Sequence, residues 1–140
     1  MSIRFAKRLL TREKRKLQTC KVYEVKIDYS HLSIWLRKRL VALFKEAKWF
    51  YNYCISQEKI NDADCTIKSV PVKVLDKFEE RKFNVLQTQH RQAIKERLFG
   101  SLKSLSTKKK QGKKVGWLKF KSEVNSVPLR ELGSTHYIDI

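Results

Sequence analysis

The N-terminal part of the chain contains a short segment with a strand-like pattern. In residues 20–28, CKVYEVKID, the side chains of Tyr23, Val25 and Ile27 share one side of an extended chain. A period of two, with β-branched and aromatic residues, predicts a β-strand with one buried face.

Residues 31–60 show the wider spacing of a long helix. Apolar side chains recur there at intervals of three and four, which predicts an amphipathic helix with a broad apolar stripe. Ser30 is the expected N-cap. The stripe consists of Leu32, Trp35, Leu36, Leu40, Leu43, Phe44, Ala47, Phe50, Tyr51 and Cys54.

A second helical region is predicted to begin in SVPVKVLDKF, residues 69–78, because proline is tolerated in the first turn of a helix. After the charged residues 79–82, apolar positions from Phe83 to Leu105 mark one face of a long helix. Gly100 is expected to end or kink this helix.

The remaining pattern predicts a loop followed by strands. Residues 106–114 are expected to form a flexible loop. The following residues, VGWLKFK at 115–121, are expected to form a short strand or an extended segment. Residues 123–140 contain two strand-like pieces. The order of one strand, two or three helices and further strands indicates an α+β fold. We expect a small β-sheet or partial barrel with an inserted helical block.

The charge balance narrows the class of partner. The formal net charge is +18, from 32 Lys+Arg against 14 Asp+Glu. Such an excess is self-repulsive, and in a basic domain it is the usual footprint of nucleic-acid binding. An acidic protein is an alternative partner. No apolar run approaches the ~20 residues that span a bilayer, and peripheral membrane binding by an arm with Ile3, Phe5, Leu9 and Leu10 on one side is a further alternative. We expect RNA and DNA as partners, and no membrane.

The cysteines and acidic residues do not form the pattern of a metal site or a catalytic site. Cys20, Cys54 and Cys65 form no CxxC pair, so this chain alone cannot build a zinc finger or ribbon. Without a signal peptide, they are expected to be reduced, in a cytoplasmic, nucleoid-associated protein. Cys54 lies on the apolar stripe, so it is expected to be a core residue. Asp62 and Asp64 lack the third carboxylate of a metal site. No catalytic triad or phosphate-binding loop is present, so we predict no catalytic residue.

The most basic stretch is KKKQGKKVGWLKFKS, residues 108–122, with seven lysines and no acid. Lysines on long stems can follow a phosphate backbone and release its counterions. Trp117 is a candidate either to stack on an unpaired base or to anchor the loop to the core, whereas Phe120 is expected to anchor. The predicted nucleic-acid-binding residues are Lys108, Lys109, Lys110, Lys113, Lys114, Lys119 and Lys121, with Trp117, followed by Arg91, Lys95 and Arg97 on the second helix.

Several segments together resemble one family. FKEAKWFYNYCISQ at 44–57 resembles the "AR-x-VYN" helix near the start of TnpB proteins, the transposon-encoded RNA-guided nucleases. VPVKVL at 70–75, LQTQHRQAIKERLFGSLKSL at 86–105 and KKVGWLKFKS at 113–122 follow in that family's order, and the last resembles its "GYPRFK" segment. VPLRELGSTHYIDI at 127–140 resembles the strands that come next.

The resemblance implies a wedge β-barrel with a helical recognition insertion. This part of the family, and of the related compact type V CRISPR effectors, binds guide RNA and the guide–target heteroduplex, and helps to recognise DNA beside the target. The RuvC-like nuclease domain with its Mg²⁺ and the zinc ribbon come later in the family's chain, so neither cofactor nor enzymatic activity is expected of these residues alone. The implied divisions are a basic leader at 1–19, a wedge-like β part at 20–30 and 106–140, and a recognition-like insertion at 31–105.

Individual positions follow from the same resemblance. Trp49, Tyr51 and Asn52 match the YN motif, and Asn52 therefore joins the candidate nucleic-acid-binding residues. Gly116, Trp117, Phe120 and Lys121 match the GYPRFK motif.

Three departures from the family are visible. Leu118 stands where the family usually has proline, and the leader is longer than expected. The chain also stops inside the expected barrel, which suggests a fragment or a short gene product.

Two other functions remain open from the sequence. A sequence-specific regulator of double-stranded DNA could use the helical block. Alternatively, the chain could be the non-catalytic subunit of a split nuclease, whose second chain supplies the carboxylates.

Overall fold

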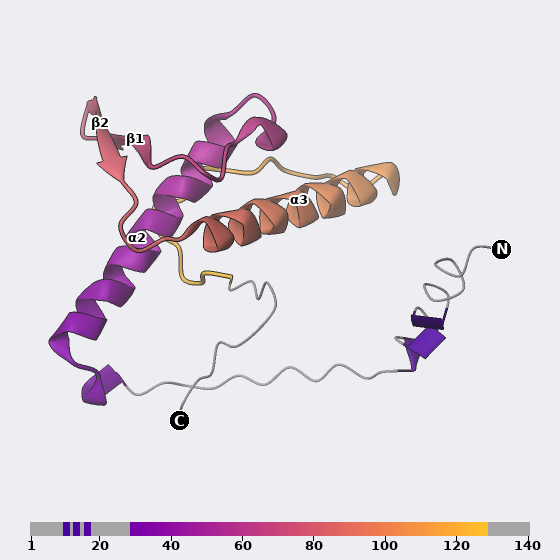
Figure 1. The fold of residues 1–140 in the computed structure, drawn as a ribbon. Coiled ribbons are helices and arrows are strands. Elements are labelled where there is room, and N and C mark those ends of the chain that lie inside the picture. The colour runs from indigo at the N-terminus through magenta and orange to yellow at the C-terminus, as the bar shows by residue number, and fades with distance from the viewer. Residues whose placement is uncertain (1–9, 12, 15, 18–28, 129–140) are drawn as a thin grey trace. The chain divides into compact units, whose positions relative to one another are not determined.

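The computed structural model describes residues 10, 11, 13, 14, 16, 17 and 29–128 (Figure 1). They belong to two units, of which the first ends at His31 and the second begins at Leu32. The strand predicted at 20–28 and the strand-like residues 129–140 lie outside the described residues. In the first unit, the described residues from Leu10 to Lys16 have helical backbone, and a short 3-10 helix covers Tyr29–His31.

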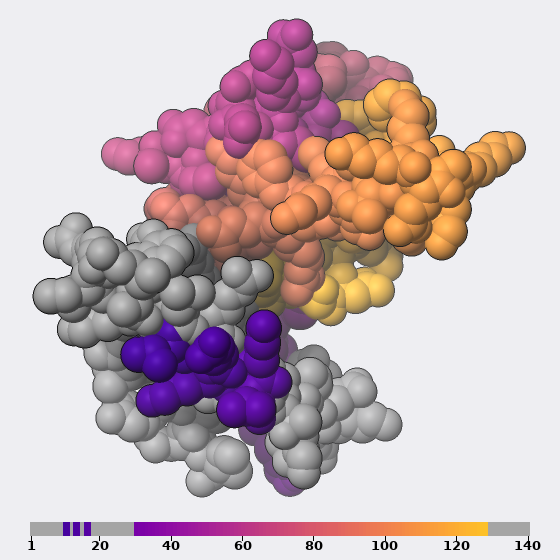
Figure 2. All heavy atoms as spheres, turned by 90° about the vertical axis from the view of Figure 1, so that its right-hand side faces the viewer, coloured from indigo at the N-terminus to yellow at the C-terminus, as the bar shows by residue number. Residues whose placement is uncertain are grey.

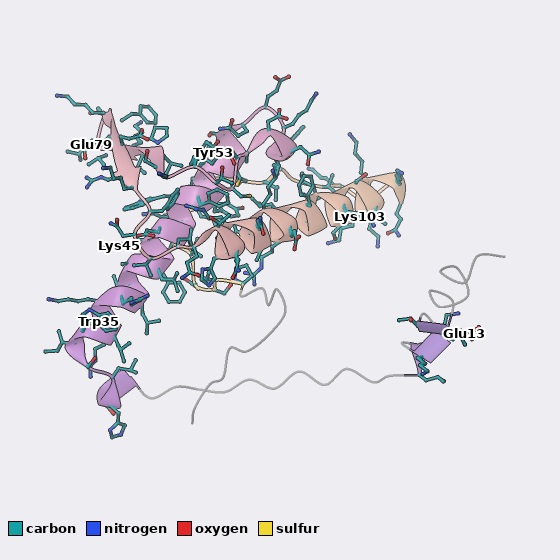
Figure 3. The ribbon with its side chains drawn as sticks, in the orientation of Figure 1. Glu13, Trp35, Lys45, Tyr53, Glu79 and Lys103 are labelled. Atoms are coloured by element: carbon teal, nitrogen blue, oxygen red, sulfur yellow. The ribbon has the colours of Figure 1, made fainter. Side chains whose placement is uncertain are left out.

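The first long helix of the second unit, α2, covers Ile34–Ser56 and confirms the helix predicted over 31–60. Its N-cap is Ser33, whose hydroxyl oxygen accepts a hydrogen bond from the backbone N–H of Leu36 at 3.3 Å, so the prediction of Ser30 was wrong by one turn. The two halves of the apolar stripe differ in how far their side chains are buried. In the N-terminal half of α2 large side chains such as Trp35 are exposed (Figure 3), whereas the buried residues of this helix all lie in its C-terminal half.

A β-hairpin occupies the segment in which a second helix was predicted. Strand β1, Ser69–Val74, pairs antiparallel with β2, Lys77–Lys82, in a register that places Val74 opposite Lys77. Valines at alternate positions of β1 favour extended backbone over helix, and proline is tolerated in an edge strand. The turn places Leu75 at φ 54°, a strained conformation for a bulky side chain.

The second long helix, α3, covers Thr88–Lys110 and passes through Gly100 without interruption. Residues 106–110, predicted as a loop, are therefore its last turns. The helix ends in a Schellman motif, in which the N–H of Gly112 donates to the carbonyl of Lys109 at 3.0 Å and the N–H of Lys113 donates to that of Lys108 at 3.1 Å. Gly112 has φ +73°, the left-handed conformation that this motif requires.

The core lies where the C-terminal half of α2 meets α3, while the hairpin lies along another side of α2 (Figure 1). Phe50 and Cys54 of α2 are fully buried and pack in one cluster with Leu86 and with Ile94 and Leu98 of α3. The prediction of Cys54 as a core residue is confirmed. Burial raises the pKa of its thiol to about 12, so the thiol is neutral at physiological pH.

A buried carboxylate joins α2 to the start of α3. Glu46 is only 3% exposed, and its side chain accepts hydrogen bonds from three consecutive backbone N–H groups. Oε1 accepts from Asn84 at 3.0 Å, and Oε2 accepts from Val85 at 2.9 Å and Leu86 at 2.7 Å. The charge of Glu46 is thus satisfied by the backbone that leads into α3.

The described residues form an α+β fold with two long helices and one two-stranded antiparallel sheet, as the sequence predicted at that level. This sheet does not close into a barrel, so the expected barrel is not found in the part of the chain described. Residues 113–128 belong to no helix or strand, so neither the short strand that was one of the two predictions for 115–121 nor a strand in the described part of 123–140 is found there. Among the described helices, none is both long and apolar enough to cross a membrane.

Candidate nucleic-acid interface

The end of α3 presents the densest group of exposed cations. Lys108, Lys109 and Lys110 lie in its last turn, and Lys113 and Lys114 follow directly after the Schellman motif. All five are exposed, and within the described part of the chain none of their ammonium groups makes an ion pair. Figure 2 shows this region, in orange, projecting with extended side chains. The first three also complement the negative end of the helix dipole, an effect on stability that requires no ligand.

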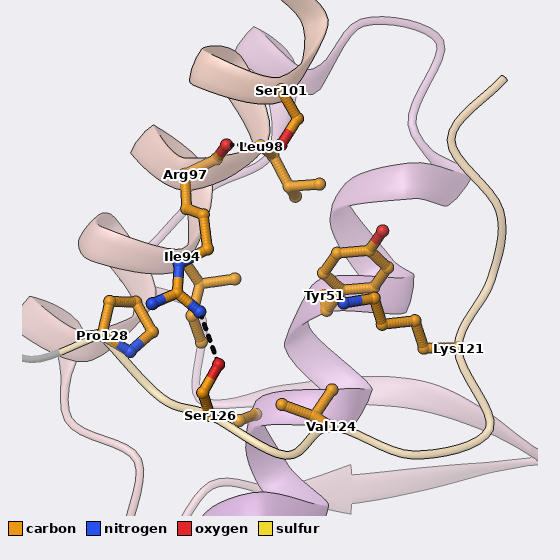
Figure 4. A pocket seen from close by; sticks show the side chains of 10 residues that line it. Tyr51, Ile94, Arg97, Leu98, Ser101, Lys121, Val124, Ser126 and Pro128 are labelled. Carbon is orange, nitrogen blue, oxygen red and sulfur yellow. Dashed lines mark hydrogen bonds between the residues drawn. The ribbon is translucent and has the colours of Figure 1, made fainter. Parts of the chain in front are cut away.

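The segment after α3, residues 113–128, returns along α2 and is named the returning segment; paired hydrogen bonds hold it against α2. Asn52 donates from Nδ2 to the carbonyl of Lys121 at 3.0 Å, and its Oδ1 accepts from the N–H of Lys121 at 2.9 Å. Tyr51 donates its hydroxyl to the carbonyl of Lys119 at 3.4 Å. The ammonium of Lys121 lies 4.6 Å from the centre of the Tyr51 ring (Figure 4). Asn52, predicted to contact nucleic acid, therefore uses its amide to fix the backbone of the lysine-rich segment.

The two aromatic side chains of this segment remain accessible. Trp117 is 92% exposed, so it does not anchor the segment to the core. Phe120 is 64% exposed, more than the anchoring interpretation predicted. Both rings are available to a ligand.

The cations predicted on the first half of α3 are already engaged. Arg91 is only 6% exposed. It donates to the carbonyl of Ile67 and the hydroxyl of Thr88, both at 2.9 Å, and its guanidinium lies 4.9 Å from the centre of the Phe83 ring. Burial lowers the pKa of Arg91 from its usual value. Lys95 donates to the carbonyls of Asn61 at 2.8 Å and Ala63 at 2.6 Å.

The side chain of Arg97 is less strongly engaged within the protein than those of Arg91 and Lys95. It is exposed, and it donates to the hydroxyl of Ser126 at 2.8 Å, as the dashed line in Figure 4 marks. It lines a small cavity of about 80 Å³ between α2, α3 and the returning segment. Of the three cations predicted on this helix, Arg97 is the one whose side chain reaches solvent most easily.

A larger groove, which sequence reasoning missed, opens between α2, the hairpin and the returning segment. Its volume is about 550 Å³. Its lining includes four aromatic side chains and three lysines, namely Trp49, Tyr53, Phe78 and Phe120 with Lys48, Lys73 and Lys121. The sequence analysis placed Phe78 and Lys73 in a helical region, whereas they lie opposite each other on the hairpin beside α2.

The acidic cluster of the 61–66 segment has a local structural role. Asp64 accepts hydrogen bonds from the backbone N–H and the hydroxyl of Thr66, both at 2.8 Å, and these bonds lower the pKa of the carboxyl. Within the described residues, no group of three or more His, Cys, Asp or Glu side chains could hold a metal ion.

Comparisons with known proteins do not identify the chain. No protein-family model, curated protein or solved structure matches it.

Proposed function

We propose that this chain is a nucleic-acid-binding module of a TnpB-like, RNA-guided nuclease system. It binds guide RNA, the RNA–DNA heteroduplex and target DNA through their phosphate backbones. In such duplexes base pairing carries the sequence information, while the protein recognises shape and charge. The proposal assigns the nuclease chemistry to another part of that system.

The observation that carries the proposal is the row of exposed lysines from Lys108 to Lys121. These lysines follow one another around the end of α3 and along the segment after it, whose backbone α2 holds at Lys119 and Lys121. Each phosphate that they neutralise releases counterions, which favours binding. In contrast, a cation already bonded to protein carbonyls, such as Lys95, contributes less.

The contact between two motifs gives further support to the family assignment. The YN-like motif supplies Tyr51 and Asn52, and the GYPRFK-like motif supplies Lys119 and Lys121. These two segments are 69 residues apart in sequence, yet Asn52 pairs with the backbone of Lys121. A direct contact gives the two motifs a physical reason to occur in the same chain.

The first test is binding to structured RNA, single-stranded DNA and duplex DNA over a series of salt concentrations, with protein freed of co-purified nucleic acid. We expect binding to structured RNA to persist at salt concentrations that abolish binding to duplex DNA. Equal, salt-labile binding to all three would reduce the function to non-specific attraction and contradict the family assignment.

Replacement of Lys113, Lys114 and Lys119 together by Ala tests the location of the site. If each contacts one phosphate of a duplex, the slope of log K against log salt falls by about 2 to 3 in magnitude. The matched control replaces three exposed lysines elsewhere, Lys16, Lys38 and Lys59, and removes the same charge. An equal change in both variants would show that total charge governs binding, and an unchanged slope in the first would exclude this segment.

A further inference from the structure

The groove between α2 and the hairpin has an unusual lining for a solvent-exposed surface. Trp49 and Tyr53 of α2 form one part of it, and Phe78 of β2 and Phe120 of the returning segment form another. Phe78 is 72% exposed and Phe120 is 64% exposed. Aromatic side chains gathered around one hollow and left accessible are typical of a ligand site.

The charges around this groove are all of one sign. Lys48, Lys73 and Lys121 line it, and among the residues that the structure describes no carboxylate does. A neighbouring hollow, which also lies between α2 and the hairpin and shares Trp49 with the groove, is lined by Glu46 and Glu80 as well as by lysines, so its charges are mixed. The aromatic groove therefore complements a ligand that combines a flat, apolar ring with negative charge.

The way the groove is assembled makes it a defined site. Phe120 lies next to Lys121, whose backbone Asn52 holds with two hydrogen bonds. Phe78 lies directly opposite Lys73 in the register of the hairpin. The volume of about 550 Å³ falls within the range of roughly 300–1,000 Å³ that is typical of small-ligand pockets, so the groove is large enough for a single nucleotide.

We infer that this groove binds one unpaired base of a nucleic-acid strand, with the base against the aromatic rings and the adjoining phosphates at Lys48 and Lys73. A base in a duplex is stacked on both faces, whereas an unpaired base has a free face for an aromatic ring. This inference rests on the proposed function and adds a preference for unpaired bases. It also transfers the stacking role predicted for Trp117 to Phe78 and Phe120.

The test is a Phe78→Leu/Phe120→Leu double variant, which keeps apolar side chains at both positions but removes the rings. The probes are a short oligothymidine and a DNA duplex of equal length, each titrated at fixed salt. Loss of stacking lowers the affinity for oligothymidine by roughly 5- to 100-fold. The affinity for the duplex is unchanged, because the lysines at the end of α3 are intact. Thermal unfolding of the variant checks that the hairpin is retained.

Two single variants complete the experiment. Trp35→Leu removes an exposed aromatic ring from the N-terminal half of α2, outside the groove, and is expected to leave both affinities unchanged. Trp117→Leu tests the rival stacking residue. A loss of oligothymidine binding in Trp117→Leu, with none in the double variant, would overturn the inference.

The other outcomes separate this inference from the proposed function. If the wild-type chain binds both probes and the double variant binds them equally well, the groove is excluded while the proposed function stands. An equal loss for oligothymidine and duplex would refute the preference for unpaired bases. If the wild-type chain binds no nucleic acid at all, both the proposed function and the groove are wrong.

Discussion

Both halves of α3 are basic, but their cations make different contacts. In the first half, Arg91 and Lys95 donate to carbonyl groups of the chain and hold the segment from Asn61 to Ile67 in place. In the last turn, Lys108, Lys109 and Lys110 extend into solvent. The same residue types thus stabilise the fold at one end of the helix and are available to a polyanion at the other.

Because of this difference, the number of cations in a segment does not show how many of them are available to bind phosphate. A cation that is bonded to backbone carbonyls has already replaced much of its hydration, and binding a phosphate would break those bonds. An exposed lysine loses little when it meets a phosphate and gains the entropy of counterion release. The following changes test whether the two halves are as different as their contacts indicate.

The largest effect is expected at the carboxylate that positions the start of α3. Replacing Glu46 by Ala removes the acceptor of three backbone N–H groups, including the buried one of Leu86. We expect the free energy of unfolding to fall by about 2–4 kcal/mol, as measured by urea denaturation. Glu46→Gln retains one acceptor oxygen, so the decrease in the free energy of unfolding should be smaller.

The exposed Glu58 provides the matched control, because Glu58→Ala removes the same charge from a solvated position. We expect the stability of this variant to change by less than about 0.5 kcal/mol. If Glu46→Ala were equally mild, the N–H groups would have found other partners, and the first half of α3 would not depend on this contact.

The next effect is expected at Arg91. Arg91→Met keeps an apolar chain beside Phe83 but leaves the carbonyl of Ile67 without its donor. The loss in stability is about 1–3 kcal/mol, because removal of a buried charge offsets part of the lost hydrogen bonding. The salt dependence of nucleic-acid binding is expected to be unchanged.

Lys103, exposed on the same helix, serves as the control for that change. Lys103→Gln should leave stability unaltered. A salt slope that fell by about 0.9 in Arg91→Met, as for a lost phosphate contact, would mean that Arg91 binds nucleic acid after all, and the contrast between the two halves would fail.

Helix α2 and the core were predictable from the sequence because each depends on a regular pattern. The stripe through Ala47, Phe50 and Cys54 has helical spacing, and the structure buries all three side chains. Glu46 occupies a position on the same stripe, three residues after Leu43 and four before Phe50. A charged residue on an apolar face was the available signal for its role, but its partners lie about forty residues away and cannot be inferred locally.

The hairpin was missed because Pro71 is compatible with both the first turn of a helix and an edge strand. The alternation of Val70, Val72 and Val74 favoured the strand and was the stronger signal. The groove depends on Phe78 lying beside α2. The prediction of a helix in this segment therefore also prevented the groove from being predicted. The exposed lysines at 108–121 were predictable from composition alone, whereas the engagement of Arg91 and Asn52 required knowledge of tertiary contacts.

The smallest effect concerns which glycine ends α3, and the two glycines should respond in opposite directions. Gly100 lies in the helix interior with no atom near an added Cβ, so Gly100→Ala should stabilise the chain by about 0.5–1 kcal/mol. Gly112 also has space around it, but its φ of +73° strains any L side chain. Gly112→Ala should therefore destabilise the end of the helix by about 1 kcal/mol.

Gly116→Ala is the control for this pair, since Gly116 is equally open and has no positive φ, and its stability should change little. Urea denaturation gives the signs, and hydrogen exchange at Lys113, whose N–H closes the Schellman motif, reports the helix end directly. If Gly100→Ala were destabilising and Gly112→Ala neutral, α3 would end near Gly100. The lysines at 108–110 would then belong to a flexible loop. Their binding to nucleic acid would include the entropic cost of ordering that loop, a cost that a preformed helix end avoids.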